Sequence, residues 1–146
     1  MPVAHREIAA AILIGTCGRL LLQQRDDKSG ILYPGRIGLF GGHRQGKETF
    51  LDCVQREIHE ETGYLLPIHA FEPLIACTMT QPDGGGLKGE FFLARGIPVE
   101  RLMITEGSLL LVEEREVPSI LHRMSPSTCY VAKIFLERMQ TGRQAT

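Results

Sequence analysis

Apolar residues gather in short runs along the chain, and Gly, Pro and polar residues separate these runs. Runs of this length with such boundaries are typical of β-strands. The stretch from Tyr64 to Thr80 is also predicted to be extended, and the sequence QPDGGG after it predicts a hairpin turn. The other predicted strands are Glu7–Ile14, Arg19–Gln24, Ile37–Phe40, Leu87–Ala94 and Ser108–Val112.

One segment has apolar residues at helical spacing. Between Thr49 and Glu61, the residues Leu51, Val54 and Ile58 recur as a stripe on one helical face. A glycine follows at position 63, and glycine suits the left-handed residue that ends a helix. The pattern predicts a helix over Thr49–Glu61.

A second helix is predicted near the end of the chain. Pro126 is suited to the first turn of a helix that runs to about Gln140, with Val131, Phe135 and Met139 on one face. Strands combined with two helices predict an α/β sandwich.

The N-terminal segment has some features of a secretion signal, because Arg6 precedes an apolar run from Ile8 to Ile14. That run is short for a signal, and a second apolar run, Leu20–Leu22, follows it after the turn GTCG. Two strands joined by a turn explain the pattern better. No stretch has the length needed to span a membrane.

Composition narrows the class of protein. A chain of 146 residues is expected to form a single domain, 1–146. A net charge of −1 and the absence of Trp give no case for binding a nucleic acid polymer. Cys17, Cys53, Cys77 and Cys129 form no CxxC pair, which argues against a zinc site or a disulfide framework. Reduced thiols in a cytoplasmic protein are the default interpretation.

Three carboxylates are concentrated at the end of the first predicted helix. Glu57, Glu60 and Glu61 are spaced i, i+3 and i+4, which places them on one face beside the negative end of the helix dipole. Such charges destabilise a helix by about 0.3–1 kcal/mol each when exposed. Hard oxygen ligands on a rigid helix suit Mg²⁺ or Mn²⁺. The alternative is a solvated helix face that Arg56 and His59 partly neutralise.

The segment Gly42–Gly63 reads GHRQGKETFLDCVQREIHEETG. Its glycines, its first glutamate and the sequence REIHEE resemble the Nudix box, the signature of hydrolases that cleave a diphosphate linked to another group. The resemblance implies a Nudix-type α/β/α sandwich with a mixed β-sheet. It also implies a metal-dependent hydrolase that acts on acid anhydrides in phosphorus-containing compounds.

The resemblance further implies roles for residues of the box. Gly41 forms a double glycine with the first box residue; in the family this pair turns the chain from a strand into a loop, and its first carbonyl often binds metal. The implied Mg²⁺ or Mn²⁺ ligands are therefore Gly41, Glu57, Glu60 and Glu61. Arg56 is expected to hold a box glutamate by a charge-assisted hydrogen bond. Glu48 is expected to fix the loop against the helix and to support the metal site from behind its ligands.

Outside the box, two arginines are candidate phosphate ligands. Arg25 and Arg36 are expected near the mouth of the site, where guanidinium groups give bidentate contacts to phosphate. The alternative is a surface ion pair with Asp26 or Asp27.

A candidate for the general base lies later in the chain. Glu106-Gly107, followed by SLLLV, is similar to the segment that brings a further glutamate toward the metal in MutT-like enzymes. Glu106 is therefore the candidate for a general base or an extra metal ligand. Glu90, Glu113 and Glu114 compete for this role, and a glutamate of the box is the alternative proton acceptor.

The box gives no information about the group attached to the diphosphate. The expected partner is a small nucleotide or another diphosphate, with a nucleoside triphosphate slightly favoured by the MutT-like segment. One alternative is a non-catalytic nucleotide sensor. Another is an isopentenyl-diphosphate isomerase, although the cysteine expected near Leu39–Gly41 is missing. A homodimer is frequent in the family, and no feature of the sequence demands one.

Overall fold

Strand β1 (Arg6–Gly15) lies inside the sheet and has buried residues on both of its faces. The computed structural model describes residues 5–81 and 84–144. In it, β1 pairs in parallel with β6 (Gly86–Ile97), and antiparallel with β4 (Phe40–His43) and β2 (Leu20–Gln24). The main strand order is β3-β2-β1-β6-β5, with β7 beside β2. The remaining strands are β3 (Ile37–Gly38), β5 (Glu72–Thr80) and β7 (Ser108–Val112).

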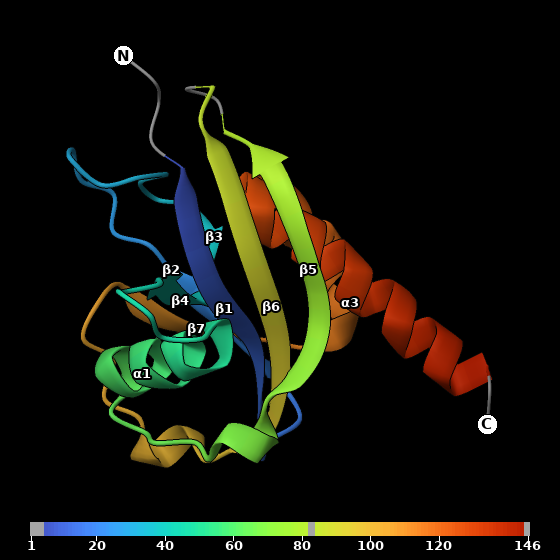
Figure 1. Ribbon diagram of the computed structural model, residues 1–146. Helices are drawn as coiled ribbons and strands as arrows, with labels where there is room; N and C mark the ends of the chain where they lie inside the picture. The colour runs from blue at the N-terminus through green and yellow to red at the C-terminus, as the bar shows by residue number, and fades with distance from the viewer. Residues whose placement is uncertain (1–4, 82–83, 145–146) are drawn as a thin grey trace.

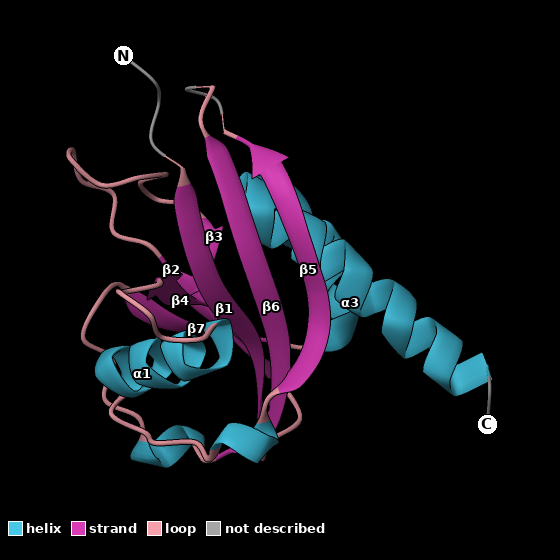
Figure 2. Cartoon of the chain, viewed as in Figure 1, coloured by secondary structure: helices cyan, strands magenta, loops and turns pink. Residues whose placement is uncertain are grey.

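The two main helices cover opposite faces of this mixed sheet (Figure 1). Ala9, Ala11 and Leu13 of β1 face α1 (Phe50–Thr62), whereas the alternate residues face α3 (Pro126–Gln144). Figure 2 shows the helices on either side of the strands. The predicted α/β/α sandwich with a mixed sheet is confirmed.

Both ends of α1 follow from local sequence. The Thr49 hydroxyl accepts a hydrogen bond from the Asp52 N–H at 3.0 Å and caps the first turn. Gly63 has a φ of 73° and donates its N–H to the His59 carbonyl. The predicted helix over Thr49–Glu61 is confirmed to within one residue at each end.

The predicted strand Ile37–Phe40 was wrong in its extent. The chain breaks pairing at Leu39, and β4 then continues through the double glycine to His43. The two glycines therefore lie in a strand, not in a turn out of it. The cause is nonlocal: β4 completes its hydrogen bonds with β1, and glycine alone gives a weak strand signal.

The prediction of one extended stretch from Tyr64 to Thr80 was wrong in its first half, where a short helix precedes β5. β5 and β6 form the predicted antiparallel hairpin, and Gln81 and Gly85 bond across its tip. Pro82 and Asp83, which belong to the predicted turn, lie outside the described residues. Short helical pieces that were not predicted are η1 (Ile68–Ala70), η2 (Val99–Arg101), η3 (Glu114–Glu116), α2 (Val117–Ile120) and η4 (Leu121–Arg123).

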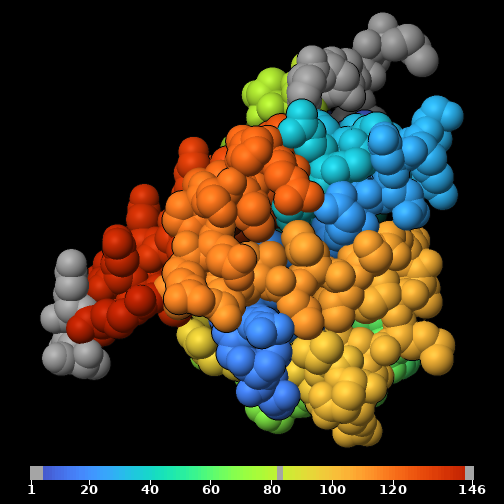
Figure 3. Space-filling view, turned by 180° about the vertical axis from the view of Figure 1, so that it is seen from behind, coloured from blue at the N-terminus to red at the C-terminus, as the bar shows by residue number. Residues whose placement is uncertain are grey.

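The last helix is longer than predicted and reaches Gln144. Val131 and Phe135 are buried against the sheet, and Met139 is half-buried. The C-terminal part of α3 projects from the body of the molecule (Figure 3). No helix among the described residues is both long enough and apolar enough to cross a membrane.

Candidate active site

The double glycine brings strand β4 into close contact with two neighbours. Gly41 has a φ of 153°, and a Cβ on it would lie 2.3 Å from the Ala9 carbonyl oxygen. A Cβ on Gly42 would lie 2.4 Å from the carboxyl carbon of Glu57. A side chain at Gly41 would therefore clash with the backbone of β1, whereas one at Gly42 would displace the Glu57 carboxylate.

Glu61 is buried behind this strand, with 5% of its surface exposed. Its Oε1 accepts a hydrogen bond from the Gly41 N–H at 2.8 Å. Burial raises the pKa of Glu61 to about 8, and the charges of Glu57 and Glu106 add to that rise. The Gly41 bond and Arg25 act in the opposite direction. The site therefore disfavours the charged form of Glu61, mainly because the carboxyl is buried.

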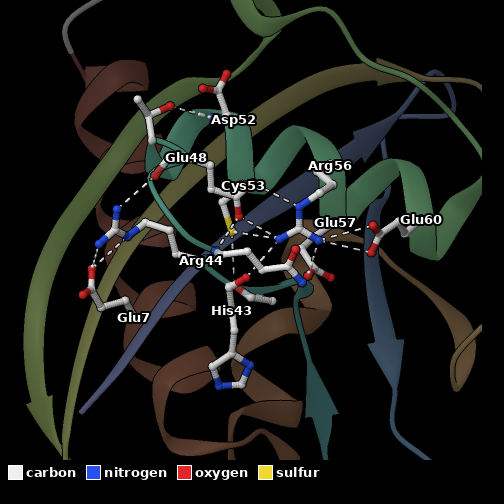
Figure 4. Close-up of polar contacts among 12 residues, drawn as sticks. Glu7, His43, Arg44, Glu48, Asp52, Cys53, Arg56, Glu57 and Glu60 are labelled. Atoms are coloured by element: carbon white, nitrogen blue, oxygen red, sulfur yellow. Dashed lines mark hydrogen bonds and ion pairs between the residues drawn. The ribbon is translucent and has the colours of Figure 1, made fainter.

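Arg56 connects the box carboxylates to the loop before α1 (Figure 4). Its Nε and Nη2 donate to both Glu48 oxygens at 3.1 and 2.8 Å, and its Nη2 also donates to the His43 carbonyl at 3.0 Å. Its Nη1 donates to Glu57 at 2.9 Å and to Glu60 at 3.3 Å. The hydrogen bond from Arg56 lowers the pKa of Glu48 to about 2. Arg56 therefore fixes both the loop and the Glu57 carboxylate.

The same loop has further support beneath and beside it. Arg44 pairs with Glu7 at 2.8 Å and donates to the Glu48 carbonyl at 3.0 Å. The Cys53 thiol is buried under the loop, 3.5 Å from the Gly42 carbonyl oxygen, and burial raises its pKa to about 12. A neutral, enclosed thiol of this kind packs and does not react.

A cavity of about 450 Å³ opens beside these carboxylates. Five of the residues selected from the sequence line it, namely Arg25, Gly41, Glu57, Glu61 and Glu106. Of the four glutamates outside the box that compete for the role of general base, Glu106 alone lines this cavity. Glu113 pairs with Arg115, and Glu114 pairs with Arg143.

Three of the selected residues do not line the cavity. Arg56 lies behind Glu57, and Glu60 points onto Arg56 with 57% of its side chain exposed. Arg36 donates to the His122 carbonyl at 2.9 Å. Within residues 5–81 and 84–144, no three His, Cys, Asp or Glu side chains are arranged to hold a metal ion. Glu60 would have to leave Arg56 to join Glu57 and Glu61.

Sequence reasoning missed part of the cavity lining, to which Tyr33, Gln81, Ser127 and Thr128 contribute. The Tyr33 hydroxyl donates to Gln81 Oε1 at 3.3 Å, and Tyr33 has an unusual φ of 51°. Two apolar residues, Leu32 and Tyr33, in a loop rich in Gly and Pro were the available signal. The polar residues gave no signal, because only the fold brings them together.

Comparison with known proteins identifies the family of this chain. The family model of the NUDIX domain matches residues 4–95, which is more than half of the chain. The chain belongs to the Nudix family. The resemblance seen in the segment Gly42–Gly63 is thereby confirmed.

A relative with a similar sequence agrees with this assignment. Nudix hydrolase 3 of Arabidopsis thaliana is 36% identical over 91 residues, which is 60% of this chain. The chain spans only 12% of that relative's length.

Solved structures of Nudix proteins share the fold at low sequence identity. A MutT protein from Methanosarcina mazei Go1 is 17% identical, with 96% of this chain and 98% of that chain covered and a TM-score of 0.78. A bifunctional NMN adenylyltransferase/ADP ribose pyrophosphatase from Francisella tularensis, complexed with AMP and a Mn ion, is 18% identical with a TM-score of 0.70. The match covers 92% of this chain and 42% of that one.

Proposed function

We propose that this Nudix protein is a metal-dependent hydrolase that cleaves the diphosphate bond of a nucleoside diphosphate derivative. The observation that carries the proposal is the contact of Glu57 and Glu61 with the double glycine in the lining of the cavity. Carboxylates held this rigidly beside a ligand-sized space suit a phosphate-bound divalent cation.

The donor set fits Mg²⁺ or Mn²⁺. Glu57, Glu61 and Glu106 bring three carboxyl groups to the cavity lining, together with the guanidinium of Arg25. The proposed ligands are Glu57, Glu60 and Glu61 with the Gly41 carbonyl. When bound, the metal would neutralise the diphosphate and lower the pKa of a bound water.

The other residues of the proposed site act on the proton and on the substrate. Glu106 would accept a proton from the attacking water, as a general base. Arg56 holds Glu57 from behind and keeps its carboxylate against Gly42. Arg25 lines the cavity and could bind phosphate oxygens. Arg36 is not included, because its guanidinium is directed to the His122 carbonyl.

The other residues of the cavity lining support a nucleoside as the attached group. They combine apolar side chains, among them Leu39, Leu87 and Phe91, with the polar groups of Gln81 and Thr128. A planar base needs such a surface with a few polar atoms at its edge. The Francisella relative, described as an ADP ribose pyrophosphatase and complexed with AMP, adds support for a nucleotide. Nucleoside triphosphates and ADP-ribose are the first substrates to test.

The test is release of phosphate, pyrophosphate or nucleoside monophosphate from a panel of nucleotides with Mg²⁺ or Mn²⁺. Glu57→Gln and Glu61→Gln should lower kcat/KM by more than about 100-fold, because loss of a residue behind a metal ligand already costs about 10–100-fold. Glu100→Gln, an exposed change on η2, is the matched control. Nucleotide binding without cleavage by the parent protein would refute the hydrolase and favour the sensor.

A further inference from the structure

The segment Met103–Gly107, here called loop 103–107, is attached to the C-terminal end of α1. The Met103 N–H donates to the Thr62 carbonyl at 2.8 Å, and the Thr105 N–H donates to the Glu61 carbonyl at 3.0 Å. The Thr105 hydroxyl donates to the Glu60 carbonyl at 3.1 Å. The last carbonyls of a helix lack partners within the helix, so the loop satisfies groups that α1 leaves open.

Each of the last four carbonyls of α1 accepts a hydrogen bond. The one remaining carbonyl of the last four, that of His59, accepts the Gly63 N–H. The helix end that carries Glu60 and Glu61 is therefore closed by the loop that carries Glu106. One of those four carbonyls, that of Glu60, is satisfied by a side chain, the Thr105 hydroxyl.

A second anchor lies on the other side of Glu106. Gln23 of β2 is 3% exposed, and its Nε2 donates to the Glu106 carbonyl at 3.1 Å. Gly107 has a φ of 64°, and a Cβ there would lie 2.4 Å from the Gln24 carbonyl oxygen. The loop therefore presses against the backbone of β2 directly after Glu106. A buried amide such as that of Gln23 must be hydrogen-bonded, which makes this contact specific.

We propose that Thr105 and Gln23 are positioning residues that hold Glu106 at a fixed place relative to Glu61. Thr105 attaches the residue before Glu106 to the metal-binding helix, and Gln23 attaches Glu106 itself to the sheet. Glu106 and Glu61 both line the cavity, so this pair of anchors sets the geometry between a proton acceptor and a metal ligand. The inference rests on the proposed function, because the role of Glu106 does.

A purely structural helix cap makes a different prediction. If Thr105 only stabilised α1, its replacement would lower the melting temperature and leave kcat unchanged in the folded enzyme. If it positions Glu106, kcat falls while KM stays close to the parent value, because the substrate still binds but its proton acceptor is displaced.

The test uses Thr105→Val, which keeps the shape of the side chain and removes its hydroxyl, together with Thr105→Ser and Gln23→Met. Thr105→Val and Gln23→Met should lower kcat by about 10–100-fold. Their KM should change by less than about twofold. Thr105→Ser should restore kcat. Thr141→Val is the control, because the Thr141 hydroxyl makes the same kind of bond, to the Glu137 carbonyl, on α3.

A second measurement does not depend on activity. Hydrogen exchange in peptides that cover loop 103–107 should be faster in Thr105→Val and Gln23→Met than in the parent, with the β1–β6 core unchanged. Slow exchange and parental kcat in both variants would overturn the positioning role. If the parent cleaves no substrate in the panel, the hydrolase proposal fails, and unchanged exchange would still refute the anchors separately.

Discussion

At the scale of single residues, the two neighbouring glycines of β4 differ in what opposes a side chain. An added Cβ on Gly42 meets the far end of a flexible glutamate, whereas one on Gly41 meets the backbone of β1. A glutamate can rotate away at small cost, but a central strand cannot move alone. Substitution of Gly42 should therefore lower activity, whereas substitution of Gly41 should lower stability.

We predict that Gly42→Ala remains folded but loses activity by about 100-fold, because displacement of a reacting group by about 1 Å costs that much. Gly41→Ala should instead lower the free energy of unfolding by about 1–3 kcal/mol or more, through strain and overpacking. Urea unfolding and kcat/KM measure the two effects. Gly142→Ala, on α3 with open space around it, is the control. Parental activity in Gly42→Ala would contradict the described placement of Glu57.

The Glu48–Arg56 pair leads to a prediction about acid. The pKa of Glu48 is lowered from 4.5 to about 2 in the folded protein. Its stabilising effect is therefore fully present above pH 4.5 and is lost as the pH falls toward 2. Glu48→Gln should lower the free energy of unfolding at neutral pH by about 1.5–3 kcal/mol, the range for a hydrogen bond to a charged group.

The same difference should shrink at about pH 3, because Glu48 of the unfolded parent is protonated there and must give up that proton on folding. Urea unfolding of parent and variant at the two pH values measures it. Glu100→Gln, which is exposed, should differ little from the parent at either pH. An equal loss in Glu48→Gln at both values would show that packing, not charge, is what Glu48 contributes.

At the scale of elements, local signals explain what could be predicted. The ends of α1 were predictable because Thr49 and Gly63 act within a few residues of the chain. The first and last residues of β4 could not be predicted from the sequence, because its hydrogen bonds go to β1, more than twenty residues away. The candidate site was likewise predictable only in part. The box carboxylates were found from their spacing, but Tyr33 and Gln81 meet only in the fold.

Helix α3 depends on nonlocal packing, and it lies beyond the segment matched by the family model. Phe135 is buried in the core cluster between α3 and the sheet, whereas Met139 only packs at its margin. Phe135→Ala should cost about 3–5 kcal/mol in the free energy of unfolding, and Met139→Ala clearly less. Chemical denaturation measures both. Equal losses would contradict the described docking of the helix.

At the scale of the whole molecule, the cavity collects its lining from segments that are far apart in sequence. Residues from β1, β2, β4, α1, the loop before β7 and the start of α3 all contribute. A ligand bound there would contact several of these segments at once. Binding should therefore stabilise the fold as a unit, not one element alone.

Mg²⁺ or Mn²⁺ should accordingly raise the free energy of unfolding, by about 2.7 kcal/mol at a concentration 100-fold above Kd. Removal of the metal by a chelator should reverse the gain, and Na⁺ at equal ionic strength should not reproduce it. Glu57→Gln should weaken this stabilisation, because it removes a carboxylate that lines the cavity. Glu60→Gln decides whether Glu60 leaves Arg56 on binding: a smaller gain shows that it joins the metal, and an unchanged gain shows that it remains paired with Arg56.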